Sequence, residues 1–177
     1  NLFQLPENKM REVRGANIGM IFQEPQTSLN PVLTAGQQIS ETLHQHTNLS
    51  NNQCITHSIE LLDAVGIPEP ERRINEYPHQ FSGGMKQRIM IAIALAGEPD
   101  LLIADEPTTA LDVTIQAQVL ELLRKLQREI DMSILFITHD IGVASQMADH
   151  IAVMKDGSIV ETKNKEDLFS NPEHEYT

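Results

Sequence analysis

The sequence predicts an α/β fold built on a parallel β-sheet, and two observations lead to this expectation. Short apolar runs rich in Ile, Leu and Val alternate along the chain with segments of helical spacing, which is the pattern of parallel strands joined by helices. A polar zone of helix-like segments, residues 31–80, interrupts this alternation. We therefore expect a parallel sheet with a helical insertion or subdomain.

The hydrophobic pattern predicts the core elements in chain order. The run IGMIF at residues 18–22 predicts a short buried strand, and residues 84–96, rich in Ile, Ala and Met, predict a buried helix. The runs LLIA at 101–104 and SILFIT at 133–138 predict two further strands. Between them, residues 113–130 carry one apolar face at helical spacing, which predicts an amphipathic helix.

The remaining elements are marked by glycine and proline. A helix with apolar residues from Ile55 to Val65 is expected to stop at Gly66, with Pro68 just beyond. A β-hairpin is expected over 151–161, because a Lys-Asp-Gly turn separates two β-like runs there. Residues 162–177 predict a short helix and a tail that contains proline.

The composition excludes several classes of protein. Among 177 residues, 13 Lys and Arg stand against 25 Asp and Glu, a formal charge of −12, whereas nucleic-acid binding needs a basic face. We therefore expect no nucleic-acid partner. No apolar run reaches the length of about 18 residues that spanning a bilayer requires. The single cysteine, Cys54, cannot form an internal disulfide.

Two acidic residues, Asp105 and Glu106, directly follow the run LLIA. If LLIA is a strand of a parallel sheet, both carboxylates lie at the carboxyl edge, where α/β proteins bind ligands. Asp105 could hold Mg²⁺, which prefers carboxylate and phosphate oxygens, and Glu106 could polarise a water for attack on a phosphate. The alternative is a solvated acidic turn after a strand.

Three further sites carry polar residues at the ends of predicted elements. Ser82, Gly83 and Gly84 stand at the start of the buried helix. Paired glycines at a helix start indicate an anion-binding site. The alternative is an ordinary helix capped by a serine. Gln23 follows the first strand and could orient a water or bind a metal, or be a polar turn residue. His139 follows SILFIT and could touch a phosphate and exchange a proton, or be a structural or surface histidine.

The order of these motifs resembles the nucleotide-binding subunit of ATP-binding cassette (ABC) transporters. By this resemblance Gln23 is the Q-loop glutamine, and FSGGM at 81–85 is the signature motif in place of the commoner LSGGQ. LLIADEP is the Walker B strand, Asp112 belongs to the D-loop, and His139 is the switch histidine. The match extends over nearly the whole chain.

Longer segments resemble one branch of this family, the importers of peptides, nickel and glutathione. The segments are QEPQTSLNP (23–31), YPHQFSGGMKQR (77–88), DEPTTALDVTIQAQ (105–118) and NPEHEYT (171–177). Methionine in the signature is usual in that branch. Glu175 departs from the branch, which has proline at this place.

The resemblance implies the P-loop NTPase fold of ABC ATPases with a helical signature subdomain and with the N-terminal part missing. No G-x-x-x-x-G-K-[ST] occurs, although the family carries this phosphate-binding loop upstream of the region where Asn1 falls. We therefore expect a truncated chain that is inactive by itself. The implied division is 1–30 as core with the Q-loop, 31–97 as helical subdomain, 98–161 as core with Walker B, D-loop and H-loop, and 162–177 as tail.

The resemblance also implies chemistry and partners. Glu106 would orient or deprotonate the attacking water, Asp105 and Gln23 would serve Mg²⁺, and His139 would contact the terminal phosphate of ATP. A second ABC ATPase domain would pair head to tail with this one, and its nucleotide would be covered by Ser82, Gly83 and Gly84, with Asp112 counted among the nucleotide-binding residues.

The expected place of such a subunit is the cytoplasmic face of the cell membrane. There residues 31–97 would dock on transmembrane permease subunits, and a periplasmic or extracellular solute-binding protein would act indirectly. We expect an ATPase that powers the import of dipeptides, oligopeptides, glutathione or nickel. Two alternatives stay open: a soluble ABC ATPase that is not tied to transport, and a catalytically inactive fragment.

Overall fold

The structure, a computed structural model, describes residues 2–109 and 111–177. The chain forms two compact units, Asn1–Ile137 and Thr138–Thr177, and each is described by itself. The first unit contains, in order, η1 (Leu2–Gln4), α1 (Glu7–Val13), β1 (Ile18–Ile21), α2 (Pro25–Ser28), α3 (Ala35–His46), α4 (Asn51–Ala64), α5 (Pro70–Arg73), η2 (Pro78–Gln80), α6 (Gly83–Leu95), β2 (Leu101–Asp105), α7 (Val113–Ile130) and β3 (Ser133–Ile137).

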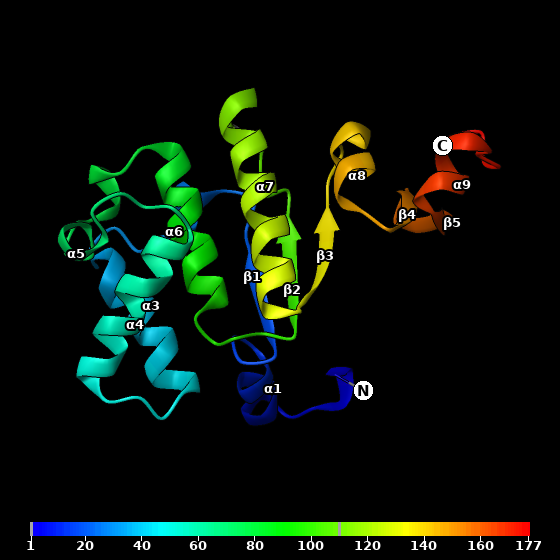
Figure 1. Ribbon diagram of the computed structural model, residues 1–177. Helices are drawn as coiled ribbons and strands as arrows, with labels where there is room; N and C mark the ends of the chain where they lie inside the picture. Colours follow the sequence, from blue (N-terminus) through cyan, green and yellow to red (C-terminus); the bar gives the residue numbers. More distant parts are fainter. Residues whose placement is uncertain (1, 110) are drawn as a thin grey trace. The chain divides into compact units, whose positions relative to one another are not determined.

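A three-stranded parallel sheet in the order β1-β2-β3 organises the first unit (Figure 1). Leu101 of β2 pairs with Ile18 of β1 on one side and with Ser133 of β3 on the other. Because the strands are parallel, their carboxyl ends meet at one edge, where Asp105 is the last residue of β2. The expected α/β class and all three expected strands are confirmed.

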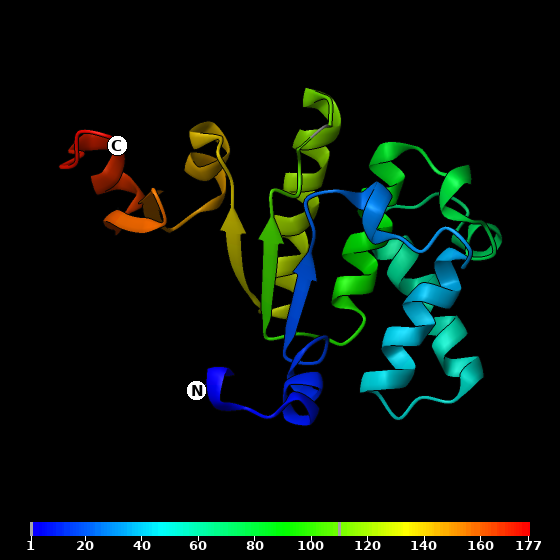
Figure 2. The same ribbon diagram turned by 180° about the vertical axis from the view of Figure 1, so that it is seen from behind.

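Helices α6 and α7 cover one face of this sheet, as both ribbon views show (Figures 1 and 2). Ile21 and Leu102 point to that face and are fully buried. The close approach of α6 requires Gly19 in β1, because a Cβ there would lie 2.4 Å from the carbonyl oxygen of Ala94. Replacing this glycine would therefore push the helix away from the sheet.

The opposite face of the sheet is apolar and open. Met20 alternates with buried positions of β1, and Leu135 and Ile137 alternate with half-buried positions of β3. Their exposed fractions are 38%, 52% and 43%. No helix within the described residues of the first unit covers them (Figure 2). Parallel sheets are ordinarily buried on both faces, so this face is an unpartnered apolar surface.

The polar zone folds into helices, as expected. Thr34 and Gln37 form a capping box at the start of α3, in which the Gln37 amide donates to Thr34 Oγ1 at 3.2 Å and the Thr34 amide donates to Gln37 Oε1 at 2.8 Å. Helix α4 ends at Ala64, and the left-handed Gly66 (φ 77°) follows it, so the expected stop is confirmed. Fully buried side chains, among them Leu43 and Leu62, hold α3 and α4 together.

The second unit contains α8 (Ile141–Met147), β4 (His150–Lys155), β5 (Ser158–Asn164) and α9 (Lys165–Ser170). The expected hairpin is confirmed as the antiparallel pair β4–β5, although β5 continues past Glu161, the expected end. The extension follows from pairing, because Asn164 lies opposite His150 in the ladder.

The tail of the second unit is fastened to β5 by a buried carboxylate. Glu161, 7% exposed, accepts hydrogen bonds from the backbone amides of Glu173 at 2.8 Å and His174 at 3.1 Å. The nearby Thr177 side chain has the largest effect on the pKa of Glu161, and the two amides add to it, so that this pKa is lowered from 4.5 to about 2. The tail 171–177 is thus held by an ionised glutamate.

Within residues 2–109 and 111–177, no helix combines the length and the apolar character that crossing a lipid bilayer demands.

Candidate functional site

The acidic pair lies at the carboxyl edge of the sheet. Asp105 ends β2 opposite Ile137 of β3, and the Glu106 amide donates to the Ile137 carbonyl at 3.0 Å. Glu106 has a left-handed backbone (φ 46°), a conformation that costs a non-glycine residue about 1–2 kcal/mol and is typical of functional sites. A turn follows, in which the Thr109 amide donates to the Glu106 carbonyl at 3.1 Å.

Gln23 reaches the same place from the neighbouring strand. It lies two residues after β1, and its Nε2 donates to Glu106 Oε2 at 3.0 Å. The parallel register of β1 and β2 therefore joins two residues that are 83 positions apart. The two sequence candidates share one hydrogen bond at the edge where α/β proteins bind ligands.

Thr109 is a site residue that the sequence analysis missed. Its Oγ1 donates to Glu106 Oε2 at 2.8 Å, so this carboxylate oxygen accepts from both Thr109 and Gln23. A threonine in the segment Glu-Pro-Thr-Thr carries no signal for this contact by itself. Only the turn geometry brings the hydroxyl over the carboxylate.

The signature motif forms the start of α6. Ser82 is the N-cap, and its Oγ accepts a hydrogen bond from the Met85 amide at 3.3 Å. Gly83 and Gly84 are the first two residues of the helix, and a Cβ built at Gly83 would meet nothing within 4 Å. The Ser-capped helix is therefore present, and Gly83 leaves open space before its amino end.

Asp112 forms the N-cap of the long helix α7. Its Oδ1 accepts from the amides of Thr114 at 3.1 Å and Ile115 at 3.0 Å. The side chain of Ile115 then touches the signature, since a Cβ at Gly84 would lie 2.8 Å from Ile115 Cγ2. Asp112 therefore orders the first turn of α7, which packs against Gly84 of the same chain.

His139 lies in the second unit, between β3 and α8. It is exposed, and the next residue, Asp140, caps α8 by accepting from the amides of Gly142 and Val143. That His139 acts at the same site as Glu106 stays a prediction.

The residues at the sheet edge can supply some, but not all, of the ligands of Mg²⁺. Asp105 and Gln23 offer one carboxylate and one amide, and the part of the chain that the structure describes holds no cluster of three or more His, Cys, Asp or Glu suited to a metal. Mg²⁺ is usually bound by one or two carboxylates together with waters and substrate phosphates. These residues therefore suit a metal that arrives with a nucleotide rather than a metal enclosed by protein ligands.

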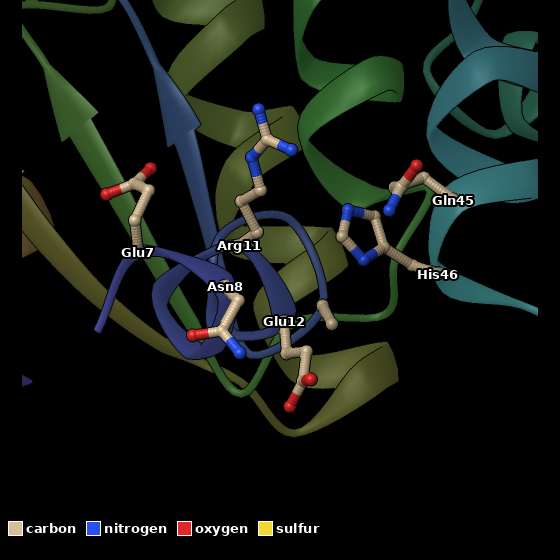
Figure 3. A pocket seen from close by; sticks show the side chains of 7 residues that line it. Glu7, Asn8, Arg11, Glu12, Gln45 and His46 are labelled. Atoms are coloured by element: carbon tan, nitrogen blue, oxygen red, sulfur yellow. The ribbon is translucent and has the colours of Figure 1, made fainter. Parts of the chain in front are cut away.

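A cavity of about 510 Å³ lies at the other end of the first unit, where α1 precedes the amino end of β1 (Figures 1 and 3). Side chains from α1 and from the end of α3 surround it. The lining residues are Glu7, Asn8, Arg11, Glu12, Ala16, Gln45 and His46. None of the sequence candidates belongs to this cavity, so it is not the site described above.

Comparisons with known proteins show which family the chain resembles. Residues 3–109 match the family model described as ABC transporter. The chain is 57% identical over 177 residues to the oligopeptide transport ATP-binding protein OppD of Bacillus subtilis (strain 168), covering 100% of this chain and 49% of the relative. It is 54% identical to the dipeptide transport ATP-binding protein DppD of the same strain, covering 100% and 53%. The glutathione import ATP-binding protein GsiA of Escherichia coli (strain K12) is 54% identical over 169 residues, covering 96% and 27%.

Solved structures show the same fold. A dimeric ATP-binding cassette in a post-hydrolysis state, bound to ADP and Pi, superposes with a TM-score of 0.80 at 32% identity, covering 92% of this chain and 68% of that one. CbiO1 from Clostridium perfringens superposes with a TM-score of 0.77 at 30% identity, covering 93% and 62%.

The chain spans about half the length of the oligopeptide and dipeptide proteins that it matches. The family match nevertheless extends over more than half of this chain, and the fold is that of the ABC ATPases. The chain therefore belongs to the ABC transporter family, among the ATP-binding proteins with a P-loop NTPase fold.

Proposed function

We propose that this chain is part of an ATP-binding subunit that powers the import of peptides or related solutes by an ABC transporter. The solute is a dipeptide, an oligopeptide, glutathione or nickel. The observation that carries the proposal is the hydrogen bond of 3.0 Å between Gln23 and Glu106 at the carboxyl edge of the sheet. The relatives named above, which act in oligopeptide, dipeptide and glutathione transport, support the choice of solute class.

Glu106 is the proposed base. Its carboxylate is hydrogen-bonded at the sheet edge, where it orients a water or takes its proton as the water attacks the terminal phosphate of ATP. His139 contacts that phosphate in the assembled site. The contacts from Gln23 and Thr109 support this role, because they fix the carboxylate at the edge where α/β proteins bind ligands.

Asp105 and Gln23 are the proposed residues for Mg²⁺. When bound with ATP, this ion neutralises the charge that develops on the transferred phosphoryl group. The sequence contains no G-x-x-x-x-G-K-[ST], and in this proposal another part of the complete subunit supplies the phosphate cradle.

The amino end of α6 is proposed to act on a second ABC ATPase domain. A helix start carries free backbone donors and the positive end of the helix dipole, and the open space at Gly83 lets a phosphate approach them. Ser82, Gly83 and Gly84 would therefore stabilise nucleotide held by the partner domain, with Asp112 ordering the adjacent helix.

The helical region 31–97 is the proposed docking site for transmembrane permease subunits at the cytoplasmic face of the membrane. Gln23 contacts Glu106 at the sheet edge and lies in the chain between β1 and this region, so it is suited to link them. A solute-binding protein outside the membrane would act through the permease. The proposal includes no nucleic-acid partner, because the formal charge of −12 disfavours phosphate binding.

The test is Glu106→Gln in the complete subunit assembled with its permease. We expect ATP hydrolysis to fall by about 10²–10⁴-fold, the usual contribution of a general base, while ATP binding persists. Glu129→Gln is the matched control, since this exposed residue lies in the last turn of α7 at the opposite end of the sheet. Near-normal hydrolysis by Glu106→Gln would show that the base is a different residue.

A further inference from the structure

We propose that the hydroxyl of Thr109 is a positioning group for the carboxylate of Glu106. The proposal rests on the function proposed above, in which Glu106 acts on the attacking water. Thr109 itself touches neither nucleotide nor water in this proposal. It acts by fixing the orientation of Glu106.

The contact is built into a hydrogen-bonded turn. Thr109 Oγ1 donates to Glu106 Oε2 at 2.8 Å, and the Thr109 amide donates to the Glu106 carbonyl at 3.1 Å. The Glu106 amide is bound in turn to the Ile137 carbonyl of β3 at 3.0 Å. The hydroxyl and the carboxylate are therefore fixed to the same piece of backbone, and that backbone is fixed to the sheet.

The hydrogen bond from Gln23 to Glu106 differs from that of Thr109, because its donor comes from a distant part of the chain. Gln23 is exposed and lies in a segment between β1 and α2, so it is attached to a different piece of backbone from Glu106. In the proposed function Gln23 also serves Mg²⁺ and links to the helical region, so its amide has roles besides the hydrogen bond to Glu106. The Thr109 hydroxyl has no role in the proposed function other than this hydrogen bond.

The physical effect is on the last torsion of the glutamate. This torsion joins an sp³ carbon to a planar carboxylate, and its preferences are broad, so a carboxylate without a fixed partner samples many orientations. A hydrogen bond to a charged oxygen is among the stronger protein hydrogen bonds. A hydroxyl at 2.8 Å from Oε2 therefore restricts the rotation and keeps the carboxylate plane oriented for the water.

The test compares Thr109→Val with Thr109→Ser in the complete subunit assembled with its permease. Valine has nearly the same shape as threonine and lacks the donor, whereas serine keeps the hydroxyl. We expect kcat for ATP hydrolysis to fall about tenfold in Thr109→Val with the KM for ATP unchanged, and to stay within about twofold of the parent in Thr109→Ser. Thr162→Val is the matched control, because Thr162 is exposed on β5, outside the turn.

Three results would overturn the proposal. A Thr109→Val subunit with normal kcat would show that the hydroxyl does not orient the base. Equal losses in Thr109→Val and Thr109→Ser, or a changed KM with unchanged kcat, would indicate a general packing effect. If Thr109→Val lowers the thermal midpoint of unfolding, Thr109→Ala gives the same comparison with less crowding, and rescue by serine remains the criterion.

The outcome is separable from that of the proposed function. If Glu106→Gln abolishes hydrolysis and Thr109→Val has no effect, only the positioning role is wrong. If Glu106→Gln retains hydrolysis, the assignment of the base is wrong, whatever Thr109→Val does.

Discussion

The two signature glycines have different surroundings, and this difference predicts different effects of the same substitution. A Cβ at Gly83 would enter open space, whereas a Cβ at Gly84 would lie 2.8 Å from Ile115 Cγ2. Both residues are helical, so alanine gains up to about 1 kcal/mol over glycine in helix propensity at either site. At Gly84 this gain is offset by turning Ile115 away from its rotamer, which costs about 0.5–1.5 kcal/mol.

We therefore expect Gly83→Ala to raise the free energy of unfolding by up to about 1 kcal/mol, and Gly84→Ala to leave it unchanged or slightly lower. Urea unfolding of the 177-residue chain, followed by far-ultraviolet circular dichroism, measures both values. In the assembled transporter the same Gly83→Ala change should lower ATP hydrolysis, because a methyl group then occupies the space before the helix start where the partner's nucleotide is proposed to approach.

The two measurements refute different parts of the reasoning. If Gly83→Ala destabilises the chain by more than about 1 kcal/mol, the space beside Gly83 is not open. If Gly83→Ala is stable and hydrolyses ATP normally, Gly83 does not face the nucleotide. Gly84→Ala serves as the matched variant, since it adds the same methyl group one residue along the helix.

Two other sites give sharp expectations. Asp112→Ala removes both cap hydrogen bonds of α7, so it should lower the free energy of unfolding by about 1 kcal/mol. It should also speed hydrogen exchange at the Thr114 and Ile115 amides, whereas Asp112→Asn, which keeps an acceptor oxygen, should have neither effect. Unchanged exchange in Asp112→Ala would show that Asp112 does not cap the helix. For Glu161 the pKa in the folded chain, about 2, lies below the ordinary value of 4.5, so its stabilising effect is complete above pH 4.5 and is lost as the pH falls toward 2. The side-chain carboxyl resonance of Glu161 should therefore have its titration midpoint near pH 2 and not near 4.5. A midpoint near 4.5, or unchanged amide resonances of Glu173 and His174 in Glu161→Gln, would show that the carboxylate does not hold the tail.

Local patterns in the sequence were sufficient for most of the secondary structure. The helix expected over 113–130 is Val113–Ile130 in the structure, because its apolar residues repeat with the helical period and Asp112 caps its start. The strand from the run LLIA ends one residue later than expected, at Asp105. The helices α1 and α8 were not predicted, because both are only two turns long and short helices carry little periodicity.

The motif order along the sequence was sufficient for the family, since residue types at fixed places in a chain are visible without coordinates. What only the tertiary structure decided are the contacts between distant residues. The hydrogen bond from Gln23 to Glu106 spans 83 positions and exists because β1 and β2 pair in one parallel register. The Thr109 contact depends on the left-handed turn at Glu106, and the tail is fastened because Glu161 faces the amides of Glu173 and His174. The physical reason is that periodicity and caps act over a few neighbouring residues, whereas the direction of a side chain depends on the packing of the elements that carry it.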